Sequence, residues 1–365
     1  MKILHLSEPI YPFVQGGLAS HTHQMAQRQT EQGHDVTVLA TTNGDVTDGE
    51  IDADYERVIK PEQARVFGAR ISLGALNWVR RRAGDFDVVH AHSHLYFTTN
   101  LAALRNVVRS GPPLVITNHG TYAFITPVLA KAHFRIFGTP TYRAADRTIC
   151  YNEHAREILT GVGVEDIEIV PNGIDVEQFS PPEERDFGRG PILWSGRMEE
   201  GKGAVAAIRA MQHIVAERPN LELHLYGDGD LREEAESTVA ELGLSENVEF
   251  KGYVSQEELV EALRDSRLYL APTDYYTFGR GIMEAIACGI PTFSTNLPSD
   301  TSIGTAGVPI TQQPRAAAAT VLEYIDEPEE LEVIAERGRA VIEKNHDFTK
   351  HIDQVTAICR ELIEE

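Results

Sequence analysis

The sequence predicts an α/β fold in which two Rossmann-like domains each hold a doubly wound parallel sheet. Short runs rich in Val, Ile and Leu alternate with helical patterns over the 365 residues, as expected of parallel strands that are buried on both faces. Twelve such runs suit two sheets better than one. A Pro-Asn-Gly turn at 171–173, followed by a polar, Pro-containing segment at 180–190, marks the boundary between the domains.

The expected elements follow this alternation in order. The runs that predict strands are 2–6, 35–40, 87–91, 114–117, 148–151 and 168–170 before the boundary, and 191–195, 221–226, 247–251, 267–271, 290–294 and 308–310 after it. Helical patterns at 18–32, 204–217, 231–242, 256–265 and 281–288 lie between them. We therefore expect an N-terminal domain at 1–173, a C-terminal domain at 174–347 and a final helix at 348–365.

The composition is that of a globular protein, with 42% apolar and 24% charged residues. No apolar run reaches the roughly 18 residues that a membrane span needs. The N-terminus reaches Glu8 before the apolar core of a signal peptide could form. Cys150, Cys288 and Cys359 are scattered and show neither metal-ligand nor disulfide spacing. These features predict a cytoplasmic protein.

The net charge of −22 excludes a nucleic-acid-binding protein, which needs a basic surface. The chain has 7 lysines against 26 arginines. Many acids with few lysines predict a halophilic, archaeal source, because a hydrated acidic surface keeps proteins dissolved in a salt-rich cytoplasm. An acidic protein without this adaptation is the alternative interpretation.

The charge is distributed unevenly along the chain. Residues 1–173 have a net charge of −2, and residues 174–365 have a net charge of −20. The segment 63–145 contains ten basic residues and two acids, with Trp78 beside Arg80, Arg81 and Arg82. Mixed basic and apolar surfaces of this kind bind anionic membranes. The alternative is a buried core with a basic cleft for a soluble anionic acceptor.

A glycine-rich motif after the predicted strand 191–195 points to an anion site. Gly196, Gly201 and Lys202 nearly match a P-loop, but Gly203 replaces the Ser or Thr that would hold magnesium, which argues against a nucleoside triphosphatase. Arg197 and Lys202 flank a turn at a predicted helix N-terminus, where free N–H groups attract phosphate. An exposed surface turn is the alternative.

A second motif joins the predicted strand 267–271 to a helix that begins near Gly279. Glu284 lies one turn into that helix on a small, apolar stretch, so its carboxylate needs a hydroxyl or a cation as partner. A buried structural salt bridge is the alternative to a ligand contact. The first strand–helix turn contains Gly16 and Gly17, which allow a close backbone approach to a ligand.

Histidines gather where two predicted strands end. His90, His92 and His94 alternate, and His119 precedes Gly120 after the next strand. Alternate residues of one strand rarely surround one ion, and no acid occurs between 88 and 145, so we expect no metal site. The pair Asp228 and Asp230 in a glycine turn is likewise interpreted as a tight loop. His119 is expected to donate to a polar ligand, with a structural histidine as the alternative.

In order and spacing, these motifs resemble those of the family 4 retaining glycosyltransferases of the GT-B fold. The resemblance runs along essentially the whole chain. It covers Gly16-Gly17, His90-Ala91-His92, residues 117–120, residues 170–175 with Phe179, Gly196-Arg197 with Lys202-Gly203, Gly227 with Gly229, residues 248–252, and Phe278-Gly279 with Glu284-Ala285. The resemblance implies two domains facing each other across a cleft, with the last helix crossing back to the first domain.

The resemblance also implies roles for single residues. Arg197, Lys202 and His119 would act in catalysis, and the donor diphosphate would meet Gly16, Gly17, Arg197, Lys202, Gly279 and Arg280. Glu284 would bind the ribose, and His119, Tyr276, Thr277, Phe278 and Gly279 the donor sugar. Gly227, Gly252, Tyr253 and Val254 would line the base. The acceptor side would include His92, Tyr122, Arg80, Arg81 and Arg82.

One position departs from the family pattern of a Glu, seven residues and a second Glu. Tyr276 stands eight residues before Glu284, where the family has its first Glu. This glutamate usually contacts the donor sugar, so the replacement leaves the sugar open and favours an unusual or modified one.

The implied reaction moves a sugar, with retention, from a UDP- or GDP-linked donor to a glycan, lipid or lipid-phosphate acceptor. The acceptor attacks from the front face while the leaving phosphate takes its proton, so neither metal nor cofactor is expected. A lipid acceptor would place the enzyme on the inner leaflet of the cell membrane. A nucleotide-sugar epimerase and a non-catalytic sugar-nucleotide binding module are the alternatives, and the sequence does not predict an oligomeric state.

Overall fold

The structure is a computed structural model that describes residues 1–8, 17–42, 53–66, 69–108, 111–120, 133–274, 279–295, 297 and 302–365. Gly16, Tyr122, Tyr276, Thr277 and Phe278 lie outside the described residues. The chain divides into two compact units: unit 1 comprises Met1–Asn172 with Thr349–Glu365, and unit 2 comprises Gly173–Phe348. Each unit is an α/β domain around a parallel sheet, which confirms the expected fold class.

Unit 1 contains a seven-stranded sheet in the order β3-β2-β1-β6-β7-β8-β9, and all its strand pairs are parallel. Its strands are β1 (Lys2–Leu6), β2 (Asp35–Thr42), β3 (Glu56–Pro61), β6 (Val88–His92), β7 (Leu114–Thr117), β8 (Arg147–Cys150) and β9 (Ile167–Ile169). β4 (Ala64–Val66) and β5 (Ala69–Ile71) form a separate antiparallel pair. The chain builds outward from β1 in one direction and from β6 in the other, so the order reverses between these two strands.

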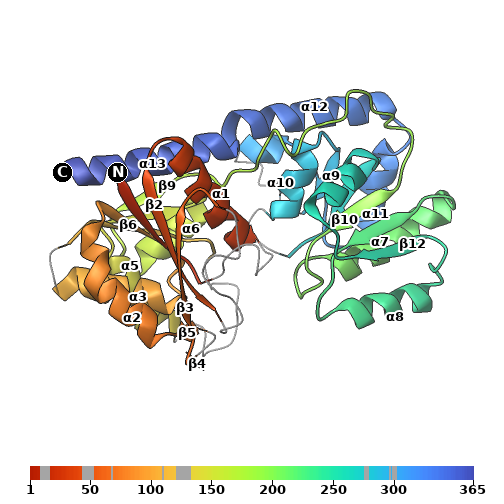
Figure 1. The fold of residues 1–365 in the computed structure, drawn as a ribbon. Helices are drawn as coiled ribbons and strands as arrows, with labels where there is room; N and C mark the ends of the chain where they lie inside the picture. The colour runs from red at the N-terminus through yellow and green to blue at the C-terminus, as the bar shows by residue number, and fades with distance from the viewer. Residues whose placement is uncertain are drawn as a thin grey trace. The chain divides into compact units, whose positions relative to one another are not determined.

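Helices cover this sheet, as the apolar strands require. They are α1 (Gly17–Glu31), α2 (Leu73–Arg82), α3 (Phe97–Val108), α5 (Thr139–Arg143), α6 (Glu153–Gly161) and α13 (Phe348–Glu364), with short turns η1 (Ala83–Asp85) and η3 (Phe134–Gly138). α1 and α13 lie side by side, since Gln29 and Gln32 donate hydrogen bonds to Thr356 and Asp353. α2 and α3 contact each other on the opposite side of the sheet (Figure 1).

Unit 2 contains a six-stranded parallel sheet in the order β12-β11-β10-β13-β14-β15. Its strands are β10 (Ile192–Ser195), β11 (Leu223–Tyr226), β12 (Val248–Gly252), β13 (Leu268–Ala271), β14 (Thr292–Ser294) and β15 (Val308–Pro309). Its helices are α7 (Ala204–Glu217), α8 (Arg232–Leu242), α9 (Gln256–Arg264), α10 (Arg280–Ala287), α11 (Pro314–Tyr324) and α12 (Pro328–Asn345), with a short turn η4 (Ser302–Thr305). Here the strand order reverses between β10 and β13.

Each expected strand is present within one or two residues of its predicted bounds, but β3 and the short pair β4 and β5 were missed. β3 reads Glu-Arg-Val-Ile-Lys-Pro, and only its two central residues are buried. An edge strand with charged ends lacks the continuous apolar run that identifies buried parallel strands. Among the described helices, none is both long and apolar enough to span a membrane.

Candidate active site

The carboxyl end of β10 is followed by a loop rich in glycine, residues 196–203, which we call the glycine loop. Ligands of doubly wound sheets bind beyond the carboxyl ends of the strands at the point where the strand order reverses. In unit 2 this point is the β10–β13 pair. The glycine loop therefore occupies the position at which this sheet is expected to bind a ligand.

Backbone contacts hold the start of the glycine loop against the loop after β11. Gly196 N donates to Tyr226 O at 2.9 Å, and Met198 N donates to Asp228 O at 2.9 Å. A Cβ atom on Gly227 would lie 1.9 Å from Gly196 O, so a larger residue would separate the two loops. The glycines here allow a close backbone approach.

The end of the glycine loop is held against the segment after β13. Thr273 Oγ1 and Asp274 N both donate to Gly201 O, at 2.7 and 2.8 Å. Gly203 has a φ of +88°, and a Cβ there would lie 2.5 Å from Pro272 O. Gly203 is the N-cap of α7, so these contacts fix where the N-terminus of α7 points.

Two cations lie on the glycine loop. The Arg197 side chain is 72% exposed and pairs with Glu199 at 3.0 Å. Lys202 is half-buried, and the pKa of its ammonium group is lowered. Burial is the largest cause; Glu199 acts in the opposite direction, and Arg197 lowers the pKa further. The first turn of α7 contains no acid. A helix N-terminus together with two cations is suited to binding phosphate.

A second helix N-terminus lies beside the first. Gly279 caps α10, whose first turn also contains no acid. A Cβ on Gly281 would lie 2.7 Å from the Tyr269 hydroxyl and 3.0 Å from Ser195 O. The first turn of α10 therefore packs directly on the end of β10, next to the glycine loop.

Arg280 and Glu284 form a pair within α10. Arg280 Nε lies 2.7 Å from Glu284 Oε1, and the Glu284 side chain is 10% exposed. The sequence left a ligand hydroxyl and a cation open as partners of this carboxylate, and the structure shows a cation. Their four-residue spacing within one helix brings the two side chains together.

The residues expected around a base lie farther along the same edge of the sheet. Gly252 ends β12 with a φ of +68°, and its carbonyl accepts from Gly227 N at 2.7 Å. Tyr253, which follows it, is 63% exposed, and Val254 is half-buried. Apart from Gly17, which lies in unit 1, the described residues of the predicted diphosphate, ribose and base groups thus lie along one edge of unit 2.

At the corresponding edge of unit 1, hydrogen bonds connect four aromatic residues from four adjacent strands. His5 Nδ1 lies 2.9 Å from His92 Nε2, His92 Nδ1 lies 3.1 Å from His119 Nε2, and His119 Nδ1 lies 2.5 Å from the Tyr151 hydroxyl. At the other end, His5 Nε2 lies 2.7 Å from Gln29 Oε1. We call this series, from Tyr151 to Gln29, the histidine relay.

Three more histidines pack around the relay: His21, His90 and His351. His5 and His92 are fully buried, whereas His119 is partly exposed. Burial lowers the pKa of His5 and His351 to about 4 and that of His119 to about 3, and it holds those of His90 and His92 well below the usual range. These rings are therefore neutral at physiological pH.

Two trios of these histidines are close enough to share a metal ion, His5-His90-His92 and His21-His92-His119. Both include His92, whose two ring nitrogens already take part in hydrogen bonds with other imidazoles. Both trios also lack a carboxylate to offset the charge of a metal ion. The hydrogen-bonded arrangement accounts for the positions of these rings without a metal.

Sequence reasoning missed His5, Gln29 and Tyr151 as parts of this site. His5 and His90 are partners in the β1–β6 register, which places them on the same face of the sheet. A signal was present, because His5, His92, His119 and Tyr151 all lie in or just after predicted strands. His94, which was grouped with His90 and His92, instead pairs with the Tyr142 hydroxyl at 2.9 Å.

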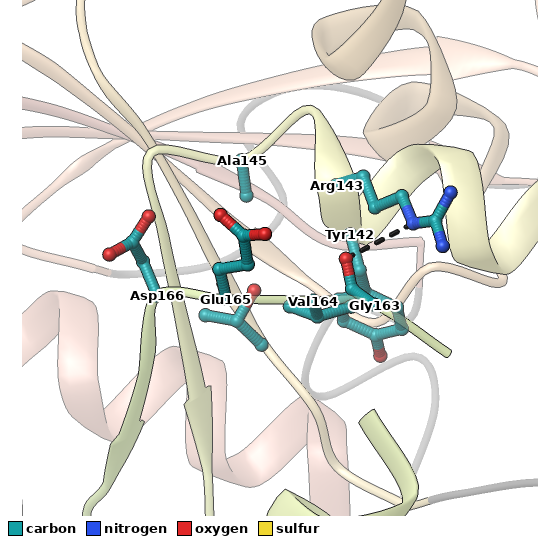
Figure 2. Close-up of a pocket in the computed structure, with 8 residues that line it drawn as sticks. Tyr142, Arg143, Ala145, Gly163, Val164, Glu165 and Asp166 are labelled. Carbon is teal, nitrogen blue, oxygen red and sulfur yellow. Dashed lines mark hydrogen bonds between the residues drawn. The ribbon is translucent and has the colours of Figure 1, made fainter. Parts of the chain in front are cut away.

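A pocket of about 400 Å³ opens elsewhere in unit 1. Figure 2 shows it lined by Glu165, Asp166 and Arg143, with Arg143 Nε donating to Gly163 O at 3.1 Å. It lies at the amino ends of β8 and β9, opposite the edge where ligands of such sheets bind. Its two carboxylates are also unsuited to a phosphate ligand.

The basic segment of unit 1 forms an exposed apolar surface. Of the ten large apolar side chains that are exposed among the described residues, seven come from α2, α3 and η3: Leu73, Leu76, Leu104, Val107, Val108, Ile136 and Phe137. We call this surface the α2–α3 face (Figure 1). Arg80, Arg81 and Arg82 are exposed on α2, and Arg82 pairs with Asp85. Trp78 was expected on this surface but packs against Phe86 and the core.

Comparisons with known proteins agree with this geometry. Residues 15–178 match the Glycosyltransferase Family 4 profile, and residues 176–341 match the profile of Glycosyl transferases group 1. A phosphatidyl-myo-inositol mannosyltransferase from Mycobacterium leprae is 30% identical over 78% of this chain and 76% of its own.

Solved structures share the fold over nearly the whole chain. Sucrose-phosphate synthase from Thermosynechococcus elongatus is similar with a TM-score of 0.80 at 17% identity, covering 100% of this chain and 99% of its own. The Anabaena protein HepE, in complex with UDP and glucose, is similar with a TM-score of 0.74 at 17% identity, covering 98% and 99%. The chain belongs to the family 4 glycosyltransferases, enzymes of the GT-B fold that act on nucleotide sugars.

Proposed function

We propose that this glycosyltransferase moves a sugar, with retention of configuration, from a UDP- or GDP-linked donor to a lipid or lipid-phosphate acceptor. The observation that carries the donor half is the meeting of two helix N-termini, those of α7 and α10, beside Arg197 and Lys202 at the strand reversal of unit 2. This arrangement offers N–H groups and positive charge to a diphosphate.

The proposed roles follow the residues that the structure places at this edge. Arg197, Lys202 and the N-terminus of α10 hold the diphosphate, Glu284 accepts from the ribose hydroxyls, and Tyr253 lies against the base. Glu284 already bonds Arg280 through Oε1, so the pair keeps the carboxylate oriented. In unit 1, Gly17 approaches the phosphate and His119 contacts the donor sugar.

The proposed reaction needs no nucleophile from the protein. The acceptor oxygen bonds to the anomeric carbon on the face from which the phosphate leaves, the bond from that carbon to the phosphate oxygen breaks, and the leaving phosphate takes the acceptor proton. The negative charge that develops on the diphosphate is stabilised by Arg197, Lys202 and the two helix N-termini. Retention and independence of metal ions are parts of this proposal.

A nucleotide-sugar panel tests the donor half. The protein is incubated in high salt with UDP- and GDP-linked sugars, and the thermal midpoint is followed, because a ligand that binds the native state raises its stability. We expect either UDP or GDP to raise the thermal midpoint, both as the free nucleoside diphosphate and as the sugar linked to it. Turnover with that donor, insensitive to EDTA and yielding an α-linked product from an α-linked donor, supports the mechanism. Epimerised donor formed without an acceptor contradicts it.

The acceptor half is supported by the α2–α3 face. The segments that carry the side chains of this face are neighbours in the fold, since α2 contacts α3, α3 contacts α5 and α5 contacts η3. Val107 and Val108 are each 71% exposed, and Arg80, Arg81 and Arg135 add positive charge to a stretch that has no acid from 88 to 145. Apolar side chains with basic neighbours complement an anionic bilayer.

Vesicle co-sedimentation tests this half. The wild type should pellet with anionic vesicles and not with zwitterionic ones, and Arg80/Arg81/Arg82→Glu should remain in the supernatant. A matched control reverses Arg28, Arg65 and Arg156, three exposed arginines outside this face, each paired with a nearby Glu. This control has the same change in net charge and should still pellet. Equal behaviour of the two triple variants would exclude a specific role for this face.

A further inference from the structure

The histidine relay occupies the place in unit 1 where the strand order reverses. β1 and β6 are the strands at the reversal, and they carry His5 and His92; β7 and β8 lie next in the sheet, and His119 and Tyr151 follow them. This is the edge at which a doubly wound sheet binds ligands. The buried end of the relay is at His5, and the partly exposed end is at His119 and Tyr151.

The end of the relay at Gln29 fixes the direction of its hydrogen bonds. Gln29 Nε2 donates to Thr356 Oγ1 at 3.1 Å, so the amide oxygen of Gln29 faces His5 Nε2 at 2.7 Å. An amide oxygen only accepts, so the proton of His5 is on Nε2. Because the ring is neutral, His5 Nδ1 must accept the next hydrogen bond.

The same reasoning continues along the relay. His92 donates from Nε2 to His5 and accepts at Nδ1 from His119 Nε2. His119 Nδ1 is then an acceptor, and the Tyr151 hydroxyl donates to it at 2.5 Å. His5, His92 and His119 therefore all have their proton on Nε2, and all hydrogen bonds of the relay point from Tyr151 toward Gln29.

We propose that Tyr151 is a positioning residue that, with His92, holds His119 in the Nε2–H tautomer and in one ring orientation at the ligand edge of unit 1. This inference rests on the proposed contact of His119 with the donor sugar. His119 Nε2–H makes the longer of the two bonds of this ring, and a sugar oxygen can share that proton. With the Tyr151 hydroxyl on Nδ1, His119 is a hydrogen-bond donor before the substrate arrives.

Tyr151→Phe tests the proposal with little change in shape. Without the hydroxyl, His119 Nε2 still donates to His92, but one of the two hydrogen bonds that orient the His119 ring is lost. We expect kcat/KM for the nucleotide sugar to fall about tenfold, the scale on which partners that orient a functional histidine act. The affinity for the free nucleotide, which unit 2 binds in our proposal, should not change.

Tyr142→Phe is the matched control. Tyr142 also bonds a buried histidine of unit 1, His94 Nδ1, through its hydroxyl at 2.9 Å, but it is not part of the relay. Tyr142→Phe should leave kcat/KM unchanged. If both variants lose activity equally, Tyr151 has only a structural role and the proposal is overturned.

A double-mutant cycle separates positioning from an independent contact. In a His119→Ala background, Tyr151→Phe should have no further effect on kcat/KM, because Tyr151 acts through His119. If the losses of kcat/KM in the two single variants multiply in the double variant, the proposal is overturned. If His119→Ala alone leaves turnover unchanged, the proposed sugar contact fails, and the relay is then tested by its tautomers.

Imidazole nitrogen shifts measured by NMR report those tautomers without any activity. In the wild type, His119 should show a protonated Nε2 and an unprotonated Nδ1, and Tyr151→Phe should move the Nδ1 shift toward that of a nitrogen without a hydrogen bond while Nε2 stays protonated. A protonated Nδ1 in the wild type would overturn the relay. So would stoichiometric Zn²⁺ binding that His92→Gln abolishes, because a metal would need the lone pairs that the relay uses.

Discussion

The two units place opposite chemistry at the same point of the same fold. At the reversal of unit 1, between β1 and β6, neutral imidazoles bond one another. At the reversal of unit 2, between β10 and β13, glycines bring backbone loops together beside Arg197 and Lys202. The fold determines at which edge of the sheet a ligand is expected to bind. The side chains at that edge determine whether it offers charged groups or neutral hydrogen-bonding groups.

This difference predicts that, on acidification, unit 1 unfolds at a higher pH than unit 2. Unfolded histidines take up protons below about pH 6.5, whereas burial holds the pKa of His5 and His351 at about 4 in the folded protein. The free energy of unfolding of unit 1 therefore falls as the pH drops from about 6.5 to 4, by about 1.4 kcal/mol per pH unit for each such ring. Protonation of surface acids over the same range relieves repulsion in unit 2.

The two tryptophans of the chain can follow this effect, since Trp78 lies in unit 1 and Trp194 in unit 2. In Trp194→Phe, the fluorescence of Trp78 should report unfolding of unit 1 near pH 4–5. In Trp78→Phe, the fluorescence of buried Trp194 should change only at lower pH. One shared transition in both variants would mean that the buried histidines do not set the acid stability of unit 1.

Removing a cation from the glycine loop should have the next largest effect. Arg197→Ala and Lys202→Ala should each lower kcat/KM by about 10²–10³, or about 2–4 kcal/mol, because each removes a charge that stabilises the leaving diphosphate. Arg209→Ala, an exposed arginine of α7, is the control and should retain activity. Normal turnover in either loop variant would remove the phosphate role from this loop.

The sequence predicted the unit 2 edge better than the unit 1 edge, for a physical reason. The glycine loop, its cations and the N-terminus of α7 are contiguous in the chain, so their spacing shows the chemistry directly. The relay joins residues up to 87 positions apart in the chain, His5 and His92 among them. That contact depends on strand order and register, which the apolar pattern of single strands does not define.

The charge pattern of the sequence identified the basic segment, but it did not predict which side chains of that segment point outward. The basic segment from 63 to 145 marked the α2–α3 face, but Trp78 faces the core and Leu73 and Leu76 are exposed instead. The last three residues of α2 are consecutive arginines. Consecutive residues of a helix point in different directions, so these arginines do not define one face. The Arg280–Glu284 pair was also missed, since the sequence analysis left the partner of Glu284 open and assigned Arg280 to the diphosphate.

Glu284→Gln should have a smaller effect that is confined to unit 2. The amide keeps the shape but loses the charge that holds Arg280 and would accept from the ribose. We expect free nucleotide to bind about tenfold more weakly, or about 1.4 kcal/mol, with no change in the tautomers of the relay. Calorimetric titration of nucleotide measures this, and Glu343→Gln, a partly exposed carboxylate paired with Arg339, is the control. Unchanged affinity would limit Glu284 to a structural ion pair.

The smallest expected effect concerns salt, and it tests the difference in charge between the halves of the chain. Unit 2 has a net charge of −18 and unit 1 of −4, so mutual repulsion destabilises mainly unit 2. Raising KCl from about 0.1 to 1 M shortens the Debye length from about 10 to 3 Å and screens this repulsion. We expect the thermal midpoint reported by Trp194 to rise by about 2–4 °C, for a gain of about 1 kcal/mol, and that reported by Trp78 to rise less. Equal shifts in the two single-tryptophan variants would show a general salt effect on burial, and the acidic half would then have no separate dependence on salt.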